Sequence, residues 1–339
     1  MNICICGGGN LGHVITGFTA ARGIGEVRLL TRHPEQWQKS IIINRPDYWL
    51  PYIGTPACIT KYPEEAVSDA DVVVLCLPGF SIREVLKQIK PWLKPNTIVG
   101  SVVSSTGFFL EAMEILPPDQ PLFGLQRVPF IARTIEYGNK AAIKGYKEKL
   151  SVAVEQTWRR EEIRQLCEQL FNTPTRLLDS YYEVTLSNSN PLLHPARLYD
   201  LWQDWHEGKV YTSIPMFYEE WTERASQYYL AMDEELQNLL KVLPVRQGNI
   251  PTVLEYYESS DITSLTQKLC SIEAFKGIPA PMKPAEGGYI PDFDSRYFTE
   301  DFAYGLNIVQ RIAREKDITT PVIDRIAAWG NGYSHQASK

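Results

Sequence analysis

The chain has 339 residues and a net charge of −6, with 44% hydrophobic and 22% charged residues. This length predicts two domains, and the composition is ordinary for a globular protein with large cores. The charge gives no basic footprint for nucleic acid, and no apolar run approaches the ~20 residues that span a bilayer. The first residues also lack the basic segment of a signal peptide. We therefore expect no nucleic acid or membrane partner, and a cytoplasmic location.

Six cysteines are scattered through the chain, and only Cys4 and Cys6 lie close together. They alternate within an apolar run, which places both on one face of a strand. A metal site would need two further ligands near in sequence, and there are none. We interpret both as buried strand cysteines and expect neither a metal site nor a disulfide framework.

The first half of the chain alternates apolar runs with amphipathic stretches. The predicted strands are residues 2–6, 26–31, 57–62, 71–77, 97–103, 150–154 and 176–178. The predicted helices are residues 11–22, 81–90 and 159–171. Continuous apolar strands separated by helices are typical of a parallel sheet that is covered on both faces. The fold class predicted for this half is an α/β Rossmann domain with a mainly parallel sheet.

Beyond about residue 182 the strand pattern ends. Tyr, Trp, Leu and Glu recur at helical spacing, as in residues 218–240, which predicts a mostly α-helical part. Residues 278–291 read as a Pro/Gly-rich loop, and residues 330–339 as an irregular end. We expect a dinucleotide-binding domain at residues 1–184 and a helical substrate and catalytic domain at residues 185–339.

The sequence GGGNLG at residues 7–12 satisfies the pattern G-x-G-x-x-G between a predicted strand and a predicted helix. Gly7 would permit the tight turn, Gly9 the approach of backbone amides to a pyrophosphate, and Gly12 close packing of helix and strand. The helix N-terminus adds unpaired N–H groups and a positive dipole end. A glycine-rich turn without a ligand is the alternative. The predicted dinucleotide contacts are Gly7, Gly9, Asn10, Leu11 and Gly12.

The choice of cofactor depends on the end of the second strand. An NAD-selective site usually has an acidic residue there, but this strand ends in Thr31 and Arg32. Arg32 could bind a 2′-phosphate with two hydrogen bonds, or it could be a solvated surface arginine. We favour NADP over NAD. Pro78 follows the strand at residues 71–77 and either lies near the cofactor or simply ends that strand.

A second group of polar residues stands where the helical part begins, in the sequence SNSNPLLHP at residues 187–195. Asn190 and His194 are four residues apart, hence on one face of a helical turn that Pro191 can start. Pro195 should disturb this turn, so we expect the helix to be kinked or to begin later. A histidine between prolines at a domain junction is poorly explained by packing, which favours a functional role for His194.

Two further groups of residues can each be interpreted in two ways, as functional or as structural. The run DSRYFTED at residues 294–301 is rich in charge and aromatic side chains, but its end also suits the first turn of a helix. Spacing alone cannot show that Asp301 meets His194. The aromatic residues either line a substrate cleft or, as is usual at helical spacing, pack in the core; they are Trp202, Trp205, Tyr218 and Trp221.

Several of these motifs together resemble the octopine/nopaline (opine) dehydrogenase family. They are the glycine loop, residues 126–133 (QRVPFIAR), residues 188–195, the Arg-Tyr-x-x-Glu-Asp segment at 296–301, residues 304–306 and Thr320-Pro321. The matches occur in the family's order over nearly the whole chain. Residues 103–108 (VSSTGF) depart from the glycine-rich turn of many relatives, which leaves the substrate undetermined.

The resemblance implies an NAD(P)H-dependent reductive condensation of an α-keto acid with the amino group of an amino acid or amine. It also implies that His194 pairs with Asp301 as the general acid and base, that Arg296 binds a substrate carboxylate, and that Asn190 orients substrate. These roles suit the residue types, because histidine exchanges protons near neutral pH and a guanidinium binds carboxylates with two hydrogen bonds.

Two other functions share the predicted domain pair. One is an NADP-dependent 2-keto-acid or ketopantoate-type reductase, which would use a lysine and an acid instead of His194. The other is a non-catalytic NADP-binding protein, since fold alone does not fix function. The sequence leaves the keto acid, the amine and the oligomeric state, monomer or homodimer, undetermined.

Overall fold

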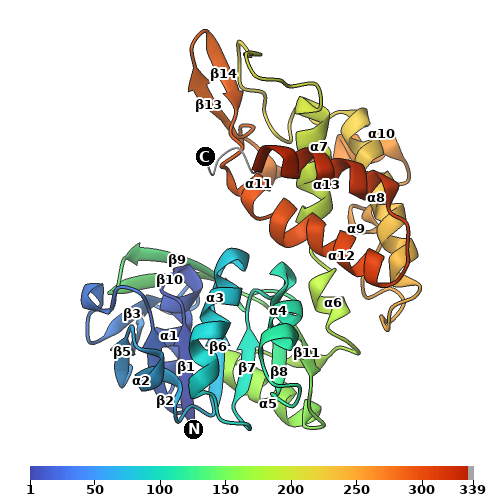
Figure 1. The fold of residues 1–339 in the computed structure, drawn as a ribbon. Coiled ribbons are helices and arrows are strands. Elements are labelled where there is room, and N and C mark those ends of the chain that lie inside the picture. The colour runs from blue at the N-terminus through green and yellow to red at the C-terminus, as the bar shows by residue number, and fades with distance from the viewer. Residues whose placement is uncertain (335–339) are drawn as a thin grey trace. The chain divides into compact units, whose positions relative to one another are not determined.

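A computed structural model describes residues 1–334 of the chain. The chain forms two compact units, the first spanning Met1–Ser187 and the second beginning at Asn188 (Figure 1). The expected boundary after residue 184 would fall within the short helix α6 (Tyr182–Thr185), whereas the units divide after Ser187.

An eight-stranded sheet forms the centre of the first unit. Its strand order is β12-β11-β8-β7-β6-β1-β2-β5, and neighbouring strands are parallel except β8 and β11. The strands are β1 (Asn2–Cys6), β2 (Glu26–Leu30), β5 (Cys58–Thr60), β6 (Val72–Leu75), β7 (Ile98–Ser101), β8 (Leu122–Leu125), β11 (Leu150–Glu155) and β12 (Thr175–Leu177). The predicted mainly parallel sheet is confirmed.

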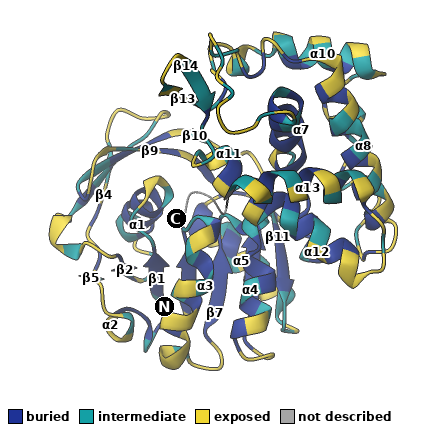
Figure 2. Cartoon of the chain, turned by 45° about the horizontal axis from the view of Figure 1, so that its top comes forward, coloured by how far each residue is buried: buried dark blue, intermediate teal, exposed yellow. Residues whose placement is uncertain are grey.

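Each face of this sheet packs in its own hydrophobic cluster, which explains why β1 is apolar throughout. Ile3 and Ile5 lie in one cluster, and Cys4 and Cys6 lie in the other. The two cysteines are fully buried with their sulfurs 3.7 Å apart. Central strands of the sheet such as β7 are buried along their whole length (Figure 2). The helices of this unit are α1 (Asn10–Ala21), α2 (Pro63–Val67), α3 (Gly79–Ile89), α4 (Phe108–Ile115), α5 (Arg160–Phe171) and α6.

A second sheet in the first unit was not predicted. It has four strands in the order β4-β3-β10-β9, namely β3 (Ile41–Asn44), β4 (Tyr52–Gly54), β9 (Phe130–Glu136) and β10 (Lys140–Tyr146). The sheet packs on helix α1, where the Phe18 ring lies 5.0 Å from that of Phe130 and 5.2 Å from that of Tyr52. Helix α1 is therefore enclosed between two sheets.

The second unit is mostly helical, as predicted. Its helices are α7 (Asn190–Trp202), α8 (Glu223–Leu240), α9 (Val253–Tyr256), α10 (Ile262–Ser271), α11 (Arg296–Thr299), the π-helical turn η5 (Phe302–Leu306), α12 (Asn307–Glu315) and α13 (Pro321–Ser334). Helix α7 lies among α8, α13 and η5. The Gly305 backbone passes so close to Pro191 that a Cβ would lie 2.8 Å from its ring.

The start of α7 corrects one expectation. The helix begins at Asn190 and continues through Pro195 instead of starting later. Pro191 occupies the first turn, where a missing N–H costs no helical hydrogen bond. Pro195 does remove one such bond, but every residue from Pro191 to Leu198 is buried. Packing of this enclosed segment offsets the loss.

Other differences concern loops and helix ends. Residues 278–291 are not only a loop, because they contain the antiparallel hairpin of β13 (Met282–Ala285) and β14 (Gly288–Pro291). Its turn uses Gly287 at a φ of +82°, a left-handed conformation that glycine adopts without strain. Helix α8 begins at Glu223 and not at residue 218, because Thr222 caps it by accepting the Ala225 N–H.

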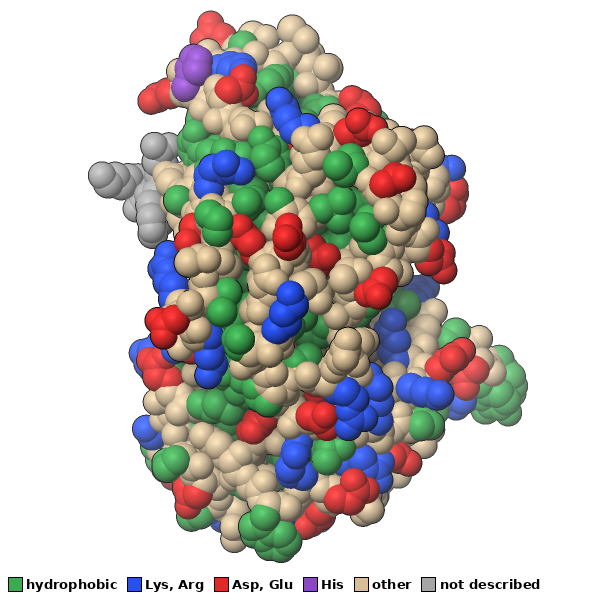
Figure 3. Space-filling view, turned by 90° about the vertical axis from the view of Figure 1, so that its right-hand side faces the viewer, with side chains coloured by type: hydrophobic (Ala, Val, Ile, Leu, Met, Phe, Trp, Pro, Cys, Tyr) green, Lys and Arg blue, Asp and Glu red, His purple; other side chains and the backbone are tan. Residues whose placement is uncertain are grey.

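At the other end of the unit, residues 330–334 continue helix α13 and are not irregular. Residues 335–339, the rest of the expected irregular end, lie outside the described residues. Within residues 1–334, no helix combines the length and apolar character that crossing a membrane requires. Figure 3 shows a face on which basic and acidic side chains are intermixed, in keeping with the balanced charge of the sequence.

Candidate functional site

The glycine loop between β1 and α1 is shaped by three different demands. Gly7 has a φ of +116°, and a Cβ there would lie 2.7 Å from the Cys76 carbonyl oxygen. A Cβ on Gly12 would collide with the Gly7 carbonyl. A Cβ on Gly9 would meet no atom of the described residues within 4 Å, apart from those of its own chain neighbours. The fold itself therefore requires the first and third glycines, whereas the space in front of Gly9 is open.

The N-terminus of α1 has unused hydrogen-bonding capacity. Gly9 is its N-cap residue, no side chain caps it, and its first turn contains no acidic residue. The first amides of a helix have no partners within the helix and carry the positive end of its dipole. The loop thus offers N–H donors to an anion at the place where a pyrophosphate is expected.

The other predicted cofactor contacts lie around this loop. The buried Thr31 hydroxyl lies 2.8 Å from where a Gly8 Cβ would be. Arg32 is exposed and forms no hydrogen bond or ion pair with any residue in the described part of the chain. Pro78 is the N-cap residue of α3 and directly follows Leu77, a neighbour of Gly7. The three residues therefore belong to the carboxyl edge of the parallel sheet, near the glycine loop.

His13 anchors the glycine loop, a role that the sequence did not suggest. Its buried ring places Nδ1 2.9 Å from the Gly9 carbonyl, while Nε2 lies 2.7 Å from the Gly138 amide. Because that amide can only donate, Nε2 must be the acceptor and Nδ1 must carry the proton. Burial lowers the pKa of His13, which keeps this neutral form. Asn10 adds a second link by accepting the Thr134 N–H at 2.8 Å.

In the second unit, His194 is held at both of its ring nitrogens. Nδ1 lies 2.7 Å from Asp301 Oδ2, and Nε2 lies 2.7 Å from the Tyr218 hydroxyl. The Tyr297 ring also packs edge-on against the imidazole, with centroids 4.7 Å apart. Helix α7 supplies His194, while Asp301 immediately precedes η5. The structure thus brings together two residues that are 107 positions apart.

Tyr218 is a residue whose importance the sequence did not reveal. Its spacing favoured the core interpretation, and its side chain is indeed 4% exposed. Its ring stacks on Phe275 at 4.1 Å, but its hydroxyl points to His194. Burial, with the nearby Tyr297 and Tyr257 hydroxyls and the Asp301 carboxylate, raises the pKa of Tyr218, so the phenol stays protonated.

The other aromatic residues of this group have structural surroundings. Trp202 and Trp221 are 1% and 4% exposed and belong to the core. Trp205 is half-buried, and its indole N–H donates to the Lys209 carbonyl at 2.9 Å. The core interpretation therefore describes the tryptophans, whereas Tyr218 combines a core ring with a polar contact to His194.

The two predicted substrate contacts are both exposed. The Arg296 side chain is 81% exposed and forms a two-pronged ion pair with Glu300, at 2.7 and 3.0 Å. Asn190 lies at the start of α7, and its side-chain amide makes no hydrogen bond to the described residues. Both side chains are therefore accessible to a small molecule, and Arg296 already holds the partly buried Glu300 carboxylate.

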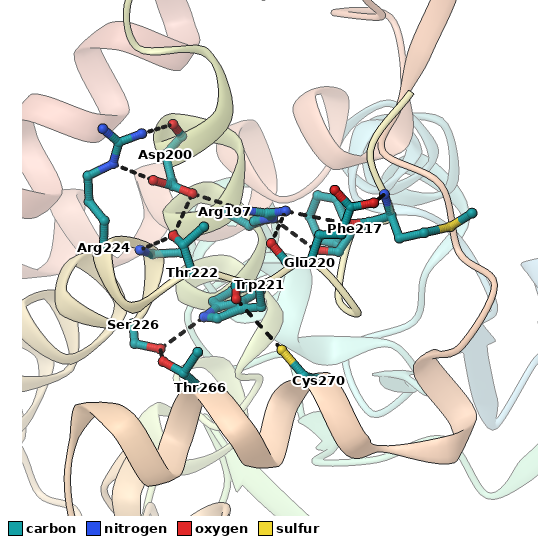
Figure 4. A network of polar contacts seen from close by, with 12 residues as sticks. Arg197, Asp200, Phe217, Glu220, Trp221, Thr222, Arg224, Ser226, Thr266 and Cys270 are labelled. Carbon is teal, nitrogen blue, oxygen red and sulfur yellow. Dashed lines mark hydrogen bonds and ion pairs between the residues drawn. The ribbon is translucent and has the colours of Figure 1, made fainter. Parts of the chain in front are cut away.

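A buried polar network fixes the segment that carries Tyr218 (Figure 4). Arg197, one helical turn after His194, is 1% exposed and pairs with Asp200 at 2.9 Å. Its guanidinium also donates to the carbonyls of Phe217 and Glu220, at 2.9 and 2.6 Å. A guanidinium has no acceptor site, so all of these contacts depend on its donors. Helix α7 therefore both presents His194 and holds the backbone on either side of Tyr218.

Asp200 extends this network to helix α8. It accepts the Thr222 hydroxyl at 2.8 Å and pairs with Arg224, whose side chain is 59% exposed. Thr222 is also the cap of α8. Asp200 thus links α7 to the start of α8, across the segment that contains Tyr218 (Figure 4).

Comparisons with known proteins cover both units. Residues 177–334 match the family model described as NAD/NADP octopine/nopaline dehydrogenase, alpha-helical domain. Residues 2–115 match the model of the NAD-dependent glycerol-3-phosphate dehydrogenase N-terminus.

Full-length relatives give the same result. Octopine dehydrogenase from Pecten maximus is 27% identical over 97% of this chain and 89% of its own. Tauropine dehydrogenase from Arabella iricolor is 29% identical over 96% of this chain and 90% of its own. A solved octopine dehydrogenase with NADH and L-arginine matches 98% of this chain and 89% of its own with a TM-score of 0.85 and 26% identity. The second unit therefore matches the helical domain of the octopine/nopaline dehydrogenase family, and the chain is similar over nearly its whole length to octopine and tauropine dehydrogenases. It is an NAD(P)-dependent oxidoreductase.

Proposed function

We propose that this chain joins an α-keto acid to the amino group of an amino acid or amine and reduces the product to a secondary amine. The observation that carries this proposal is the contact between His194 and Asp301 within the family's helical domain. A carboxylate at 2.7 Å from Nδ1 fixes the imidazole tautomer. Such a pair can give and take a proton.

The cofactor fits the first unit. The open space at Gly9 and the uncapped N-terminus of α1 suit a pyrophosphate, and the reduced nicotinamide supplies a hydride when bound. Arg32, exposed and without a partner among the described residues, supports NADP as the preferred cofactor, because a guanidinium binds a 2′-phosphate with two hydrogen bonds. Thr31 and Pro78 complete the proposed set of contacts around residues 7–12.

His194 and Asp301 would serve the proton transfers of the reaction. Condensation of a carbonyl with an amine expels water, and the departing hydroxyl needs a proton. The amine must also lose a proton before it can attack. His194 can perform both tasks in turn, since each transfer restores the form that the other requires. Asp301 holds the ring orientation and stabilises the imidazolium, as carboxylates do in comparable pairs.

Arg296 and Asn190 would position the substrates. The Arg296 side chain is 81% exposed, although its partner Glu300 is only 18% exposed. Glu300 accepts from Nε and Nη2 of Arg296, so a substrate carboxylate would bind at the other edge of the guanidinium, where Nη1 and Nη2 can form two parallel hydrogen bonds. Asn190 lies four residues before His194 on α7, so its amide is available on the same side of the helix.

The test is oxidation of NADPH and of NADH by the full-length chain across a matrix of keto acids and amino acids or amines. We expect at least one pair to give turnover far above that of its keto acid alone, with a secondary amine detected by mass spectrometry. Turnover with a keto acid alone would identify a simple reductase. Tight cofactor binding with no turnover in any combination would identify a binding protein, and either result would overturn the condensation.

A further inference from the structure

We propose that Tyr218 is a proton relay, the group through which His194 exchanges its proton with the substrate. The proposal deepens the function given above and rests on it. Both imidazole nitrogens are engaged, Nδ1 by Asp301 and Nε2 by the Tyr218 hydroxyl, each at 2.7 Å. The nitrogen opposite the carboxylate is the one that would face a substrate. In this structure its neighbour is a phenol.

Three contacts hold Tyr218 in place, so its side chain cannot easily rotate to expose His194 directly to the substrate. Its ring stacks on Phe275 with centroids 4.1 Å apart and planes 17° apart. Trp221 lies nearly parallel to it, with centroids 6.3 Å apart. The preceding carbonyl, that of Phe217, accepts a hydrogen bond from the buried Arg197. Movement of the hydroxyl away from His194 Nε2 would disrupt these aromatic contacts or the hydrogen bond between Arg197 and the Phe217 carbonyl.

A phenol can serve as a relay because it is donor and acceptor at once. When the imidazolium acts as an acid, its Nε2–H bond breaks and the proton passes to the Tyr218 oxygen. The O–H bond of Tyr218 breaks in the same step, and that proton passes to the substrate oxygen or nitrogen. One proton has left His194, one has reached the substrate, and Tyr218 is neutral before and after. The reverse movement returns a proton from the amine to His194.

The environment of Tyr218 makes the two transfers concerted. A separate tyrosinate would be a buried anion beside the Asp301 carboxylate, which is unfavourable in a region of low dielectric. Burial raises the pKa of Tyr218, in agreement with a hydroxyl that passes protons without holding a charge. The relay therefore predicts two protons in flight during the proton-transfer step, whereas direct transfer from His194 predicts one.

The first test is a proton inventory, in which kcat is measured in mixtures of H₂O and D₂O. The wild-type chain should give a curved plot, as two moving protons require. Tyr218→Phe keeps the ring and its stacking but removes the hydroxyl, and we expect kcat to fall about 10²-fold with a linear plot. Tyr228→Phe is the matched control, because Tyr228 lies on helix α8 and its hydroxyl donates to Gln203 Oε1 at 3.2 Å. A linear wild-type plot, or a Tyr218→Phe variant with wild-type kcat, would overturn the relay.

The second test does not require turnover. The ¹⁵N resonances of His194, assigned by their loss in His194→Asn, report the hydrogen bond at Nε2 in the full-length chain. We expect the Nε2 shift to change in Tyr218→Phe and to stay the same in Tyr228→Phe. An unchanged Nε2 shift in Tyr218→Phe would show that the contact is absent in solution and would refute the relay. If the substrate matrix gives no turnover while the shift changes, the proposed reaction fails and the contact stands.

Discussion

The glycine loop and the His194 site are built in opposite ways. The loop uses six consecutive residues and works because side chains are absent, so that backbone amides are exposed. The His194 site uses three side chains whose positions in the chain differ by 24 and 107 residues. A backbone site of this kind is specified locally, whereas a side-chain site depends on the whole fold. Damage to the first should impair binding, and damage to the second should impair turnover.

The largest expected effect is that of His194→Asn. Loss of the general acid and base should lower kcat by about 10²- to 10⁴-fold. The Kd of NADPH, measured by fluorescence titration, should stay as in the wild type, because the glycine loop belongs to the other unit. His206→Asn is the control, since His206 is exposed and bonds only the neighbouring Glu207 carbonyl among the described residues. A parallel loss of cofactor affinity in His194→Asn would break the distinction between the two regions.

Alanine at two glycines of the loop should separate folding from binding. Gly12→Ala places a methyl group against the Gly7 carbonyl and should destabilise the chain by about 1–3 kcal/mol, as overpacking does. Gly9→Ala meets no atom of the described residues within 4 Å, apart from those of its own chain neighbours, so Tm should not change. Its methyl group would instead crowd the pyrophosphate and weaken cofactor binding by about tenfold. Urea unfolding measures the stability of both variants, and isothermal titration measures their affinity for the cofactor. A Gly9→Ala variant with wild-type affinity would contradict the proposed cofactor position.

Arg32→Ala should change the cofactor preference by about tenfold. Hydrogen bonds to charged groups contribute about 1.5–3 kcal/mol, and exposure places Arg32 at the lower end of that range. We expect the KM for NADPH to rise and the KM for NADH to stay the same. Arg176→Ala, on the edge strand β12, removes an exposed arginine at the opposite edge of the sheet and serves as the control. Equal effects on both cofactors would show that Arg32 does not select NADP.

The smallest effect concerns pH and His13. Burial lowers the folded-state pKa of His13 below its ordinary value of about 6.5, so the unfolded chain binds this proton more readily. His13 therefore stabilises the fold above that ordinary value, and the contribution is lost as the pH falls through the folded-state pKa. Urea unfolding between pH 5 and 8 should show a shallower pH dependence for His13→Gln than for the wild type. The exposed His33→Gln serves as the control, and identical slopes for the His13 variant and the wild type would argue against the neutral anchor.

Much of the first unit could be predicted because its signals are local. Strand β1, the loop and α1 follow one another within 21 residues, and each has its own pattern. The second sheet was missed although β9 alternates buried and exposed residues at its start. That alternation is short, and residues 130–133, where it begins, also belong to the segment that resembles the family. The β13–β14 hairpin is likewise short, and its strands of four residues each lack an apolar alternation.

The His194 site could be predicted only in part. Residue type and neighbouring prolines indicated His194, but no spacing rule connects it to Asp301, and the family resemblance supplied that pairing. Tyr218 was named only as one of four aromatic residues that either line a cleft or pack in the core, and the direction of its hydroxyl is what distinguishes it from the others. Arg197 was equally silent, since its role depends on the carbonyls of a distant loop.

The anchoring of the glycine loop also has a consequence for biosynthesis. The loop is translated before its two anchors, Thr134 and Gly138, which follow their partners by 124 and 125 residues. A nascent chain that ends with β7 contains the strand and the helix that flank the loop. It lacks Gly138, whose N–H donates to His13 Nε2. Such long-range contacts slow folding, because the intervening chain must be ordered first. The loop therefore reaches its final geometry only after residues far beyond it in the chain have been translated and ordered.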